Sequence, residues 1–477
     1  MAVRNVTAVP AACLDYTYRY AQPSDLHVEG ALRRLLLATT SAPACTETGG
    51  PALQPSLLFF RGVLVQPRRT ADLLLALSRV VRTRFHIPAA MLARIGAEAD
   101  PVVTCSPHGL RFEGFSSCCS VYTRVDLLPD ALDGALLGHG TTNVDFNPPM
   151  RAALAQLRDG ETVRLSVGAL EVGVEVETRR DGGSAVERKV PLPLRWLKGF
   201  VEAQAHQSRM GLRYEVSGAE ARRFLRALPR SGTRGRATYV VPSGPGLRLS
   251  QVDSPGSVRV TGVERLLVLE ELVRHARKLR VYAGESTRSS GWELVLDDAR
   301  FHLVLSPEVW RGFSGEGQVL SDLTEDPGGA AAASVRSALR WQSRLDLEAL
   351  ARDCRLDARS VRAALARLST AGVVGYDLAE GAYYHRELPY DYAGVEALHP
   401  RLMDARKLLE EGGVRLEHED ARGVLAWVPG SGVEHRVRLT PEAGKCTCPW
   451  WARYQGERGP CKHVLAVQLL LEERRDP

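Results

Sequence analysis

The sequence predicts a multidomain α+β protein. The chain has 477 residues, which is longer than a single domain with one hydrophobic core usually is. We therefore expect roughly three to five domains or smaller modules. Helical and strand-like spacings of apolar residues both occur along the chain. The segment 324–333, TEDPGGAAAA, combines a Pro-Gly-Gly breaker with small residues and predicts a linker between an N-terminal and a C-terminal part.

Two regions of the N-terminal part are expected to mix helices and strands. Residues 1–95 form a mixed α/β region, in which apolar residues at helical spacing predict a helix at 70–84. Residues 191–323 form an α+β domain, with two helical stretches before residue 227 and a Pro/Gly/Ser-rich stretch after them.

The region between them, residues 96–190, is expected to be a β-rich α+β domain. Strand-like runs lie at 111–115 and 121–127, and Val172, Val174 and Val176 alternate with Glu171, Glu175 and Glu177. Alternation of this kind is typical of a half-buried antiparallel sheet.

A winged helix-turn-helix is expected at 334–392. Asp346 opens a short amphipathic helix that ends at Asp353, and Asp357 stands at the N-cap of a second helix at 358–370. Two strand-like runs follow and predict a hairpin, at 373–377 and 382–385.

The second of these helices carries three arginines, Arg359, Arg362 and Arg367, on the side opposite to its apolar residues. Such a helix could enter a DNA major groove while the hairpin contacts backbone phosphates. Winged helices also dock proteins, and cations on a helix often only face solvent. The three arginines are therefore candidate nucleic-acid contacts, and both interpretations stay open.

The strongest motif lies near the end of the sequence, where C-x-C at Cys446 and Cys448 is followed by C-x-H at Cys461 and His463. Zinc favours a tetrahedral shell of thiolate and imidazole ligands, and three sulfurs with one nitrogen complete it. The pattern predicts one structural Zn²⁺ ion with no open position for a reactive water. A strand hairpin before the motif and an apolar helix after it, from residue 464, predict a ββα unit.

This order of strands, C-x-C, loop, C-x-H and helix resembles the SWIM zinc-finger family, and we assign residues 395–477 to such a domain. The resemblance implies binding to DNA or protein rather than catalysis. Residues 440–477 carry six basic and five acidic side chains, which is a weak electrostatic footprint for duplex DNA. The adjacent Trp450 and Trp451 could stack on bases or complete the small core, and we expect at least one in the core.

The whole chain also resembles bacterial SWIM proteins encoded beside a MoxR-type AAA+ ATPase and a von Willebrand factor A-domain protein. The phrases GTTNVDFNPPMRAAL at 140–154 and YYHRELPYD at 383–391 are typical of that group. This resemblance implies an adaptor that works with these two kinds of partner protein in an ATPase-driven system.

Other candidate sites are weaker. The arginine-rich segment 222–236 contains no acid and is a candidate contact for phosphate or an acidic partner, although we favour a solvated surface. Cys118 and Cys119 are vicinal, and a second metal site with nearby cysteine and histidine residues would have unfamiliar spacing. We expect buried thiols there.

Catalytic motifs are missing from the sequence. It has no P-loop, GxSxG elbow, HExxH helix or zinc-deaminase signature. Asp145, Asp297 and Asp298 could in principle assemble a metal-dependent nuclease site, but they lack basic residues at motif spacing. We therefore expect a non-enzyme, and a hydrolase in the N-terminal part is the alternative from a different class.

Composition indicates the class of protein and its cellular compartment. The apolar content of 44%, the charged content of 25% and a net charge of +6 are ordinary for a water-soluble chain. The sequence shows neither a signal peptide nor a membrane-spanning run, and nine cysteines are too few for a disulfide framework. We expect a cytoplasmic adaptor without membrane contact, with a DNA-binding factor as the first alternative.

Overall fold

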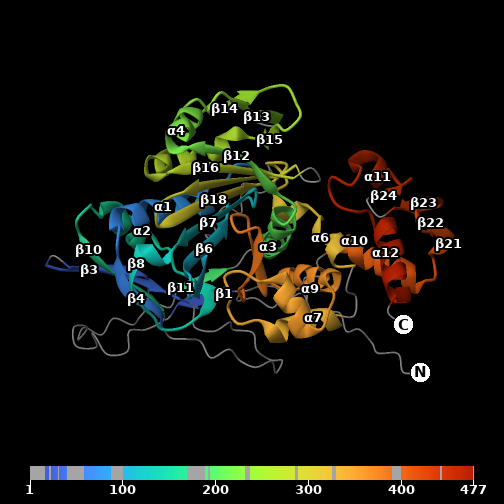
Figure 1. The fold of residues 1–477 in the computed structure, drawn as a ribbon, viewed down its shortest axis with the longest axis horizontal. Coiled ribbons are helices and arrows are strands. Elements are labelled where there is room, and N and C mark those ends of the chain that lie inside the picture. The colour runs from blue at the N-terminus through green and yellow to red at the C-terminus, as the bar shows by residue number, and fades with distance from the viewer. Residues whose placement is uncertain are drawn as a thin grey trace.

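The computed structural model describes residues 17–20, 23–30, 32–39, 58–86, 100–168, 188–191, 194–230, 237–284, 288–324, 329–388, 399–440 and 443–475. Within these ranges the chain has a mixed α/β fold with several sheets (Figure 1). The alternation predicted at 171–177 lies outside the described residues. No helix in the described ranges is long and apolar enough to span a bilayer.

A five-stranded sheet forms one end of the molecule. Its spatial order is β2-β3-β10-β4-β8, and its strands are β2 (Asp25–Glu29), β3 (Leu32–Ala38), β10 (Thr162–Gly168), β4 (Leu58–Leu64) and β8 (Leu132–Leu136). The pair β3 and β10 is parallel. Helix α2 (Pro148–Gln156) packs against β2 of this sheet and against helix α1 (Pro67–Arg82). Helix α1 confirms the helix predicted at 70–84. The short strands β1 (Thr17–Tyr20) and β11 (Arg188–Pro191) pair with each other.

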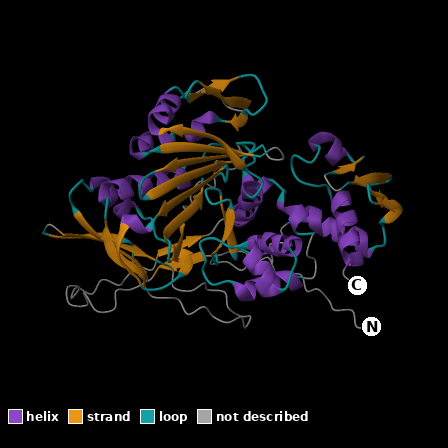
Figure 2. Cartoon of the chain, in the orientation of Figure 1, coloured by secondary structure: helices purple, strands orange, loops and turns teal. Residues whose placement is uncertain are grey.

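An eight-stranded antiparallel sheet crosses the middle of the molecule (Figure 2). In spatial order its strands are β12 (Gly211–Ser217), β16 (Lys278–Ala283), β17 (Ser290–Val295), β18 (Ala299–Leu305), β7 (Val121–Leu127), β6 (Gly109–Phe115), β5 (Val102–Ser106) and β9 (Gly140–Asn143). The strands predicted at 111–115 and 121–127 are β6 and β7. Because β18 pairs with β7, segments from both sides of residue 190 build one sheet.

The two faces of this central sheet differ in chemistry. One face is apolar: Val125 of β7 pairs with Phe112 and Phe301, and all three belong to the core cluster that includes α1. The other face is charged, because Arg124 of β7 lies between Glu113 and His302 in the same register. Each of these charged residues is at most 2% exposed. The sheet is therefore buried on both faces.

A smaller three-stranded sheet lies beside the edge strand β12. Its order is β14-β13-β15, with strands β13 (Ala237–Ser243), β14 (Gly246–Ser250) and β15 (Val258–Thr261). Helix α4 (Gly218–Arg226) packs against this sheet, and α5 (Val268–Leu272) packs against α4. Helices α3 (Leu194–Gln207) and α6 (Val319–Asp322) pack against each other and against α9 (Ala358–Thr370). Short 3-10 turns are η3 (Pro129–Ala131), η4 (Val263–Leu266), η5 (Val273–His275) and η6 (Phe313–Gly315).

Three helices and a hairpin follow. They are α7 (Ala330–Ala338), α8 (Leu347–Cys354), α9 (Ala358–Thr370), β19 (Val374–Asp377) and β20 (Ala382–His385). Asp346 and Asp357 cap α8 and α9 as the sequence predicts, since their Oδ1 atoms accept backbone N–H groups. The alanines expected in the linker instead form the first turn of α7, where Ala332 packs into a small core. A run of alanines suits a helix as well as a linker.

The C-terminal unit stands apart at one end of the ribbon (Figure 1). It consists of α10 (Pro400–Glu410), β21 (Arg415–Asp420), β22 (Gly423–Pro429), β23 (Glu434–Leu439), β24 (Gly444–Cys446), α11 (Pro449–Tyr454) and α12 (Lys462–Arg475). Strands β21 to β24 form an antiparallel meander. The predicted hairpin and final helix are β22, β23 and α12, whereas α10, β21 and α11 were not expected.

Candidate metal centre

The four predicted ligands come together from three element boundaries. Cys446 is the last residue of β24, and Cys448 is the N-cap of α11, with its Sγ accepting the Trp451 N–H at 3.4 Å. Cys461 directly precedes α12, and His463 lies in its first turn. The sheet thus supplies Cys446, the start of α11 supplies Cys448, and the start of α12 supplies Cys461 and His463.

The cluster has the dimensions of a tetrahedral metal site. All four ligand atoms lie within 4.8 Å of one another, and Cys446 Sγ lies 3.8 Å from His463 Nδ1. Tetrahedral zinc with its usual bond lengths requires ligand separations of about 3.5 to 3.8 Å. Only a small contraction around the ion is therefore needed.

The ligands are buried, and the backbone supports two of them. Their exposed fractions range from 2% to 7%. The backbone N–H of Cys448 donates to Cys446 Sγ at 3.4 Å. Donors aimed at sulfur stabilise the thiolate form, which is the form that binds zinc.

The close approach of the thiols shifts their titration. The hydrogen bond from Cys446 lowers the pKa of Cys461 to about 4. That same hydrogen bond raises the pKa of Cys446, and burial raises the pKa of Cys448. Neighbouring thiolates repel one another, so a divalent cation is needed to keep all three sulfurs ionised together.

The second nitrogen of the imidazole ligand also has a distinct setting. His463 Nε2 is buried and has no hydrogen-bond partner within the described residues. The ring of His435, from β23, lies with its centroid 4.6 Å from the ring of His463. Packing against a ring, instead of a carboxylate or carbonyl partner, orients this ligand.

Comparison with known proteins agrees with this geometry. Residues 435–470 match the SWIM zinc finger. The matched segment contains all four ligands, so the SWIM finger of this chain has Cys446, Cys448, Cys461 and His463 in position to bind one zinc ion. The match covers the finger and not the rest of the chain.

Other comparisons add little. No curated protein matches the sequence. Among solved structures, Proliferating Cellular Nuclear Antigen from Entamoeba histolytica is similar over 53% of this chain and 99% of its own, with 10% identity and a TM-score of 0.32. At that TM-score neither the fold nor the function of this chain follows from the likeness.

The cysteines around residue 118 do not form a second metal centre. Within the described ranges the finger supplies the single group of metal-ligating side chains. Cys105 and Cys119 are fully buried, as expected for structural thiols, and burial raises the pKa of each to about 12. Cys118 is half-buried and has Ser120 Oγ 3.1 Å from its sulfur.

The three acids considered for a nuclease do not form one carboxylate cluster. Asp145 accepts the Ser24 N–H at 2.8 Å, so it fixes a turn in the five-stranded sheet region. Asp298 pairs with Arg69 at 2.5 Å, while Asp297 pairs with Arg277 at the surface. Each carboxylate therefore has a local structural partner, and the three do not converge.

The three candidate arginines of α9 have different surroundings. Arg359 is exposed but lies 3.5 Å from Glu472 of α12, and Arg362 is exposed. Arg367 is half-buried. The C-terminal end of the helix is covered, because Ser369 donates to Gln204 Oε1 of α3. Only the first half of α9 faces solvent.

The arginine-rich segment is described only in part. Residues 231–236 lie outside the described ranges. In the rest of the segment Arg223 pairs with Glu220 at 2.5 Å, and Arg230 pairs with Glu270 at 2.8 Å. Acids distant in sequence, or just before the segment, thus offset part of its charge.

Sequence reasoning missed the residues that fasten the finger to the rest of the protein. Arg401 of α10 donates to the carbonyls of Arg458 (2.8 Å), Pro460 (2.9 Å) and Glu316 (3.2 Å). Arg458 donates to the Gly315 carbonyl at 3.0 Å. The segment around η6 is therefore a docking loop for the loop that precedes Cys461.

Glycines make this close approach possible. A Cβ atom on Gly459 would collide with the carbonyl of Gly317, and Gly459 also has a φ of 75°. The glycines at 315–317, which are unrelated to any nucleotide motif, are the signal that could have indicated a backbone-to-backbone contact.

Trp450 is also part of this contact region. The guanidinium groups of Arg401 and Arg458 lie 4.5 Å and 4.9 Å from its ring centroid. Both tryptophans are half-buried and pack against the core cluster of the finger. This arrangement agrees with the expectation that at least one tryptophan completes the core.

A second missed contact fastens the hairpin β19–β20 to the charged face of the central sheet. Asp377 accepts from Arg111 at 2.5 Å and from Arg124 at 3.0 Å, and both arginines also contact Asp126. Arg386, which directly follows β20, pairs with Glu113. We call these residues the hairpin clasp.

The hairpin clasp is almost dry. The side chains of Asp377 and Arg124 are 2% and 1% exposed, and Arg386 is 1% exposed. The two arginines hold the pKa of Asp377 and that of Asp126 well below their usual range, although burial alone would raise them. All members of the clasp are therefore ionised at neutral pH. Opening the clasp costs free energy, because it separates buried charges from their partners.

Proposed function

We propose that the protein is a non-catalytic, zinc-stabilised scaffold that recognises other proteins. The observation that carries this proposal is the way the C-terminal modules dock. The finger is fastened to the central part through the half-buried Arg401 and Arg458. The hairpin β19–β20 is fastened to it by ion pairs of the buried Arg124 and Arg386. Such contacts suit one rigid recognition body better than DNA-reading modules on a flexible tether.

The zinc site supports a structural role. Three thiolates and one imidazole complete a tetrahedral shell, so no position is left for a substrate or an activated water. The energy of zinc binding then stabilises a finger whose own core is small.

We interpret residues 334–392 as a winged helix in which α9 is the recognition helix and β19–β20 the wing. In DNA-binding relatives of this architecture the wing contacts phosphates. Here the wing is occupied by the hairpin clasp, and the C-terminal end of α9 is occupied by α3. These contacts favour protein docking over DNA binding.

The resemblance to bacterial SWIM proteins suggests the partners. We propose that the scaffold joins a MoxR-type AAA+ ATPase to a von Willebrand factor A-domain protein in the cytoplasm. The nearly balanced charge of the finger, six basic against five acidic residues at 440–477, suits a protein partner better than a nucleic acid.

The first test is DNA binding across a salt series, comparing the wild type with an Arg359→Ala, Arg362→Ala, Arg367→Ala triple variant. The scaffold proposal expects no binding of duplex or single-stranded DNA at moderate salt. Micromolar binding with a steep salt slope that the triple variant flattens would instead establish a DNA-binding factor.

The second test measures the proposed partners directly. The purified chain is mixed with a MoxR-type ATPase and a von Willebrand factor A-domain protein from the same organism, and complexes are sized by light scattering. We expect a complex that forms only when the finger is loaded with zinc. Failure to bind either protein would contradict the adaptor role while leaving the zinc site intact.

A further inference from the structure

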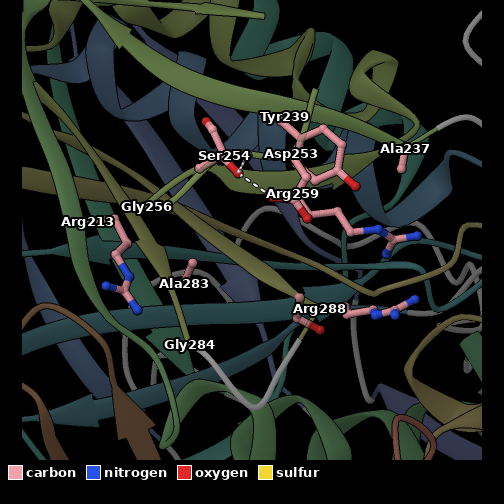
Figure 3. A pocket seen from close by; sticks show the side chains of 12 residues that line it. Arg213, Ala237, Tyr239, Asp253, Ser254, Gly256, Arg259, Ala283, Gly284 and Arg288 are labelled. Carbon is pink, nitrogen blue, oxygen red and sulfur yellow. Dashed lines mark hydrogen bonds between the residues drawn. The ribbon is translucent and has the colours of Figure 1, made fainter. Parts of the chain in front are cut away.

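A polar cavity of about 500 Å³ lies between the edge strand β12, the small sheet and residues 283–284 and 288–289 at the ends of β16 and β17 (Figure 3). Arginines from three separate elements line it, namely Arg213 of β12, Arg259 of β15 and Arg288 before β17. Figure 3 shows Arg259 and Arg288 extending in the same direction, with Arg213 on the other side of the cavity. Among the described residues, this cavity has no cluster of metal-ligating side chains, unlike the zinc site.

Arg213 enters the cavity because of a β-bulge. Leu212 pairs with Tyr282 and Tyr214 pairs with Val281, so Arg213 is the extra residue of β12 at this point. A bulge changes the direction in which the extra residue's side chain points, and bulges are frequent next to functional sites. On a regular strand the alternation would direct this arginine differently.

The small sheet presents a polar face to the cavity. Tyr239 and Arg259 are directly opposite each other on β13 and β15, and Ala237 lies two residues before Tyr239 on the same face. The opposite face, with Val240 and Val258, is buried in the core. The sheet thus has one face for the core and one face for the cavity.

The loop between β14 and β15 forms a stiff rim. Ser257 Oγ donates to Asp253 Oδ1 at 2.8 Å, and the Ser257 N–H donates to the Ser254 carbonyl at 2.9 Å. Tyr214 Oη donates to the Gly256 carbonyl at 2.5 Å. The hydroxyl groups and backbone of this rim are therefore held in place before any ligand arrives.

The cavity is cationic. Its lining contains three arginines and one acid, Asp253. The partner acids of two arginines stand outside the lining: Glu308 pairs with Arg259, and Glu457 of the finger pairs with Arg288. A ligand anion could therefore approach both guanidinium groups from the cavity side.

We propose that this cavity binds a phosphorylated small molecule of the size of a mononucleotide. Several guanidinium groups on different sides suit a group with several oxygens, as in phosphate, because each planar fork can donate to two of them. The cavity volume lies in the range of ligand sites. The ring of Tyr239 offers a flat apolar surface for a base between these cations.

The geometry also links this cavity to the finger. Arg288 contacts Glu457, which lies in the loop before Cys461. A phosphate that takes Arg288 competes with that contact. Removal of the competing acid by Glu457→Gln should therefore strengthen ligand binding, whereas loss of a cavity arginine should weaken it.

The test is calorimetric titration of the full zinc-loaded chain with ATP, AMP and pyrophosphate at constant ionic strength. We expect saturable binding of one ligand, weakened about tenfold or more by Arg213→Ala or Arg288→Ala. Both side chains are exposed, so these variants should fold. Arg248→Ala, on the exposed side of β14 and outside the cavity, is the matched control and should leave the affinity within about twofold.

Two further variants sharpen the result. Tyr239→Leu should weaken AMP binding but leave pyrophosphate binding unchanged, and Glu457→Gln should strengthen both. The proposal is overturned if none of the three ligands binds, if Arg248→Ala weakens binding as much as Arg213→Ala, or if single-stranded DNA binds and mononucleotides do not. None of these outcomes depends on whether the chain acts as a protein adaptor.

Discussion

Asp377→Asn is the sharpest test of the hairpin clasp. The substitution keeps the shape of the side chain and an oxygen that can accept the Ala379 N–H, which lies 2.9 Å from Asp377 Oδ1. It removes the negative charge that Arg111 and Arg124 share. The buried Arg124 and the half-buried Arg111 then remain with Asp126 as their one carboxylate partner in the clasp.

The expected cost follows from burial. Breaking one side of a buried, hydrogen-bonded ion pair typically costs about 3 to 5 kcal/mol, because an uncompensated charge stays in a dry site. Asp377 and Arg124 are nearly inaccessible, at 2% and 1% exposed, so little solvent screening applies. We therefore expect the hairpin to open more easily by roughly this amount, a factor of about a hundred to several thousand in its opening equilibrium.

Hydrogen exchange of the β19 and β20 amides measures this opening directly, without the assumption that a multidomain chain unfolds in two states. The matched control is Glu380→Gln in the same hairpin. Glu380 is 38% exposed and pairs with Arg300 at 3.1 Å, so its loss should cost at most about 1 kcal/mol. If the two variants exchange alike, the clasp does not hold the hairpin.

Three other changes test the finger and its docking. Cys446→Ala should reduce bound zinc from one ion per chain to near zero by mass spectrometry, whereas Cys354→Ala, a cysteine outside the site, should leave it unchanged. Burial raises the pKa of Glu202 to about 8 from an ordinary value of 4.5, so the unfolded chain loses this proton first and stability should fall by about 1.4 kcal/mol per pH unit between those values. Glu202→Gln should remove that slope in unfolding measured at several pH values, and an unchanged slope would assign it to another group. Gly459→Val should undock the finger without loss of zinc, seen as faster proteolysis beside η6; a protease pattern equal to that of the wild type would contradict the close contact with Gly317.

The parts of the fold that follow from local sequence were predictable. Helix α9 begins after Asp357 because this side chain caps it. The zinc ligands were predictable because C-x-C and C-x-H state both the chemistry and the spacing of the site. Strands β6 and β7 were predictable from the strand-like runs at 111–115 and 121–127. Each of these features depends on a few neighbouring residues.

The burial of the charged sheet face was not predictable in the same way. Arg111 and Glu113 on β6, and Arg124 and Asp126 on β7, alternate with apolar residues as on a sheet with one solvated face. In the folded chain Asp377 and Arg386, more than 250 positions away along the chain, cover that face. Alternation records polarity, and only tertiary contacts decide whether a polar face meets water or an opposite charge.

Local sequence can predict a winged helix or a zinc finger, but tertiary contacts decide which of its surfaces are accessible to a partner. A winged helix or a zinc finger predicted from local spacing has surfaces that could serve a ligand, and the sequence does not say which of them the rest of the chain occupies. In this protein the hairpin contacts Arg111 and Arg124, the finger loop contacts the η6 segment through Arg401, and Arg359 contacts Glu472 of α12. A partner that binds the covered face of the hairpin must displace buried ion pairs, whereas the pair of Arg359 and Glu472 is largely exposed and can open at little cost.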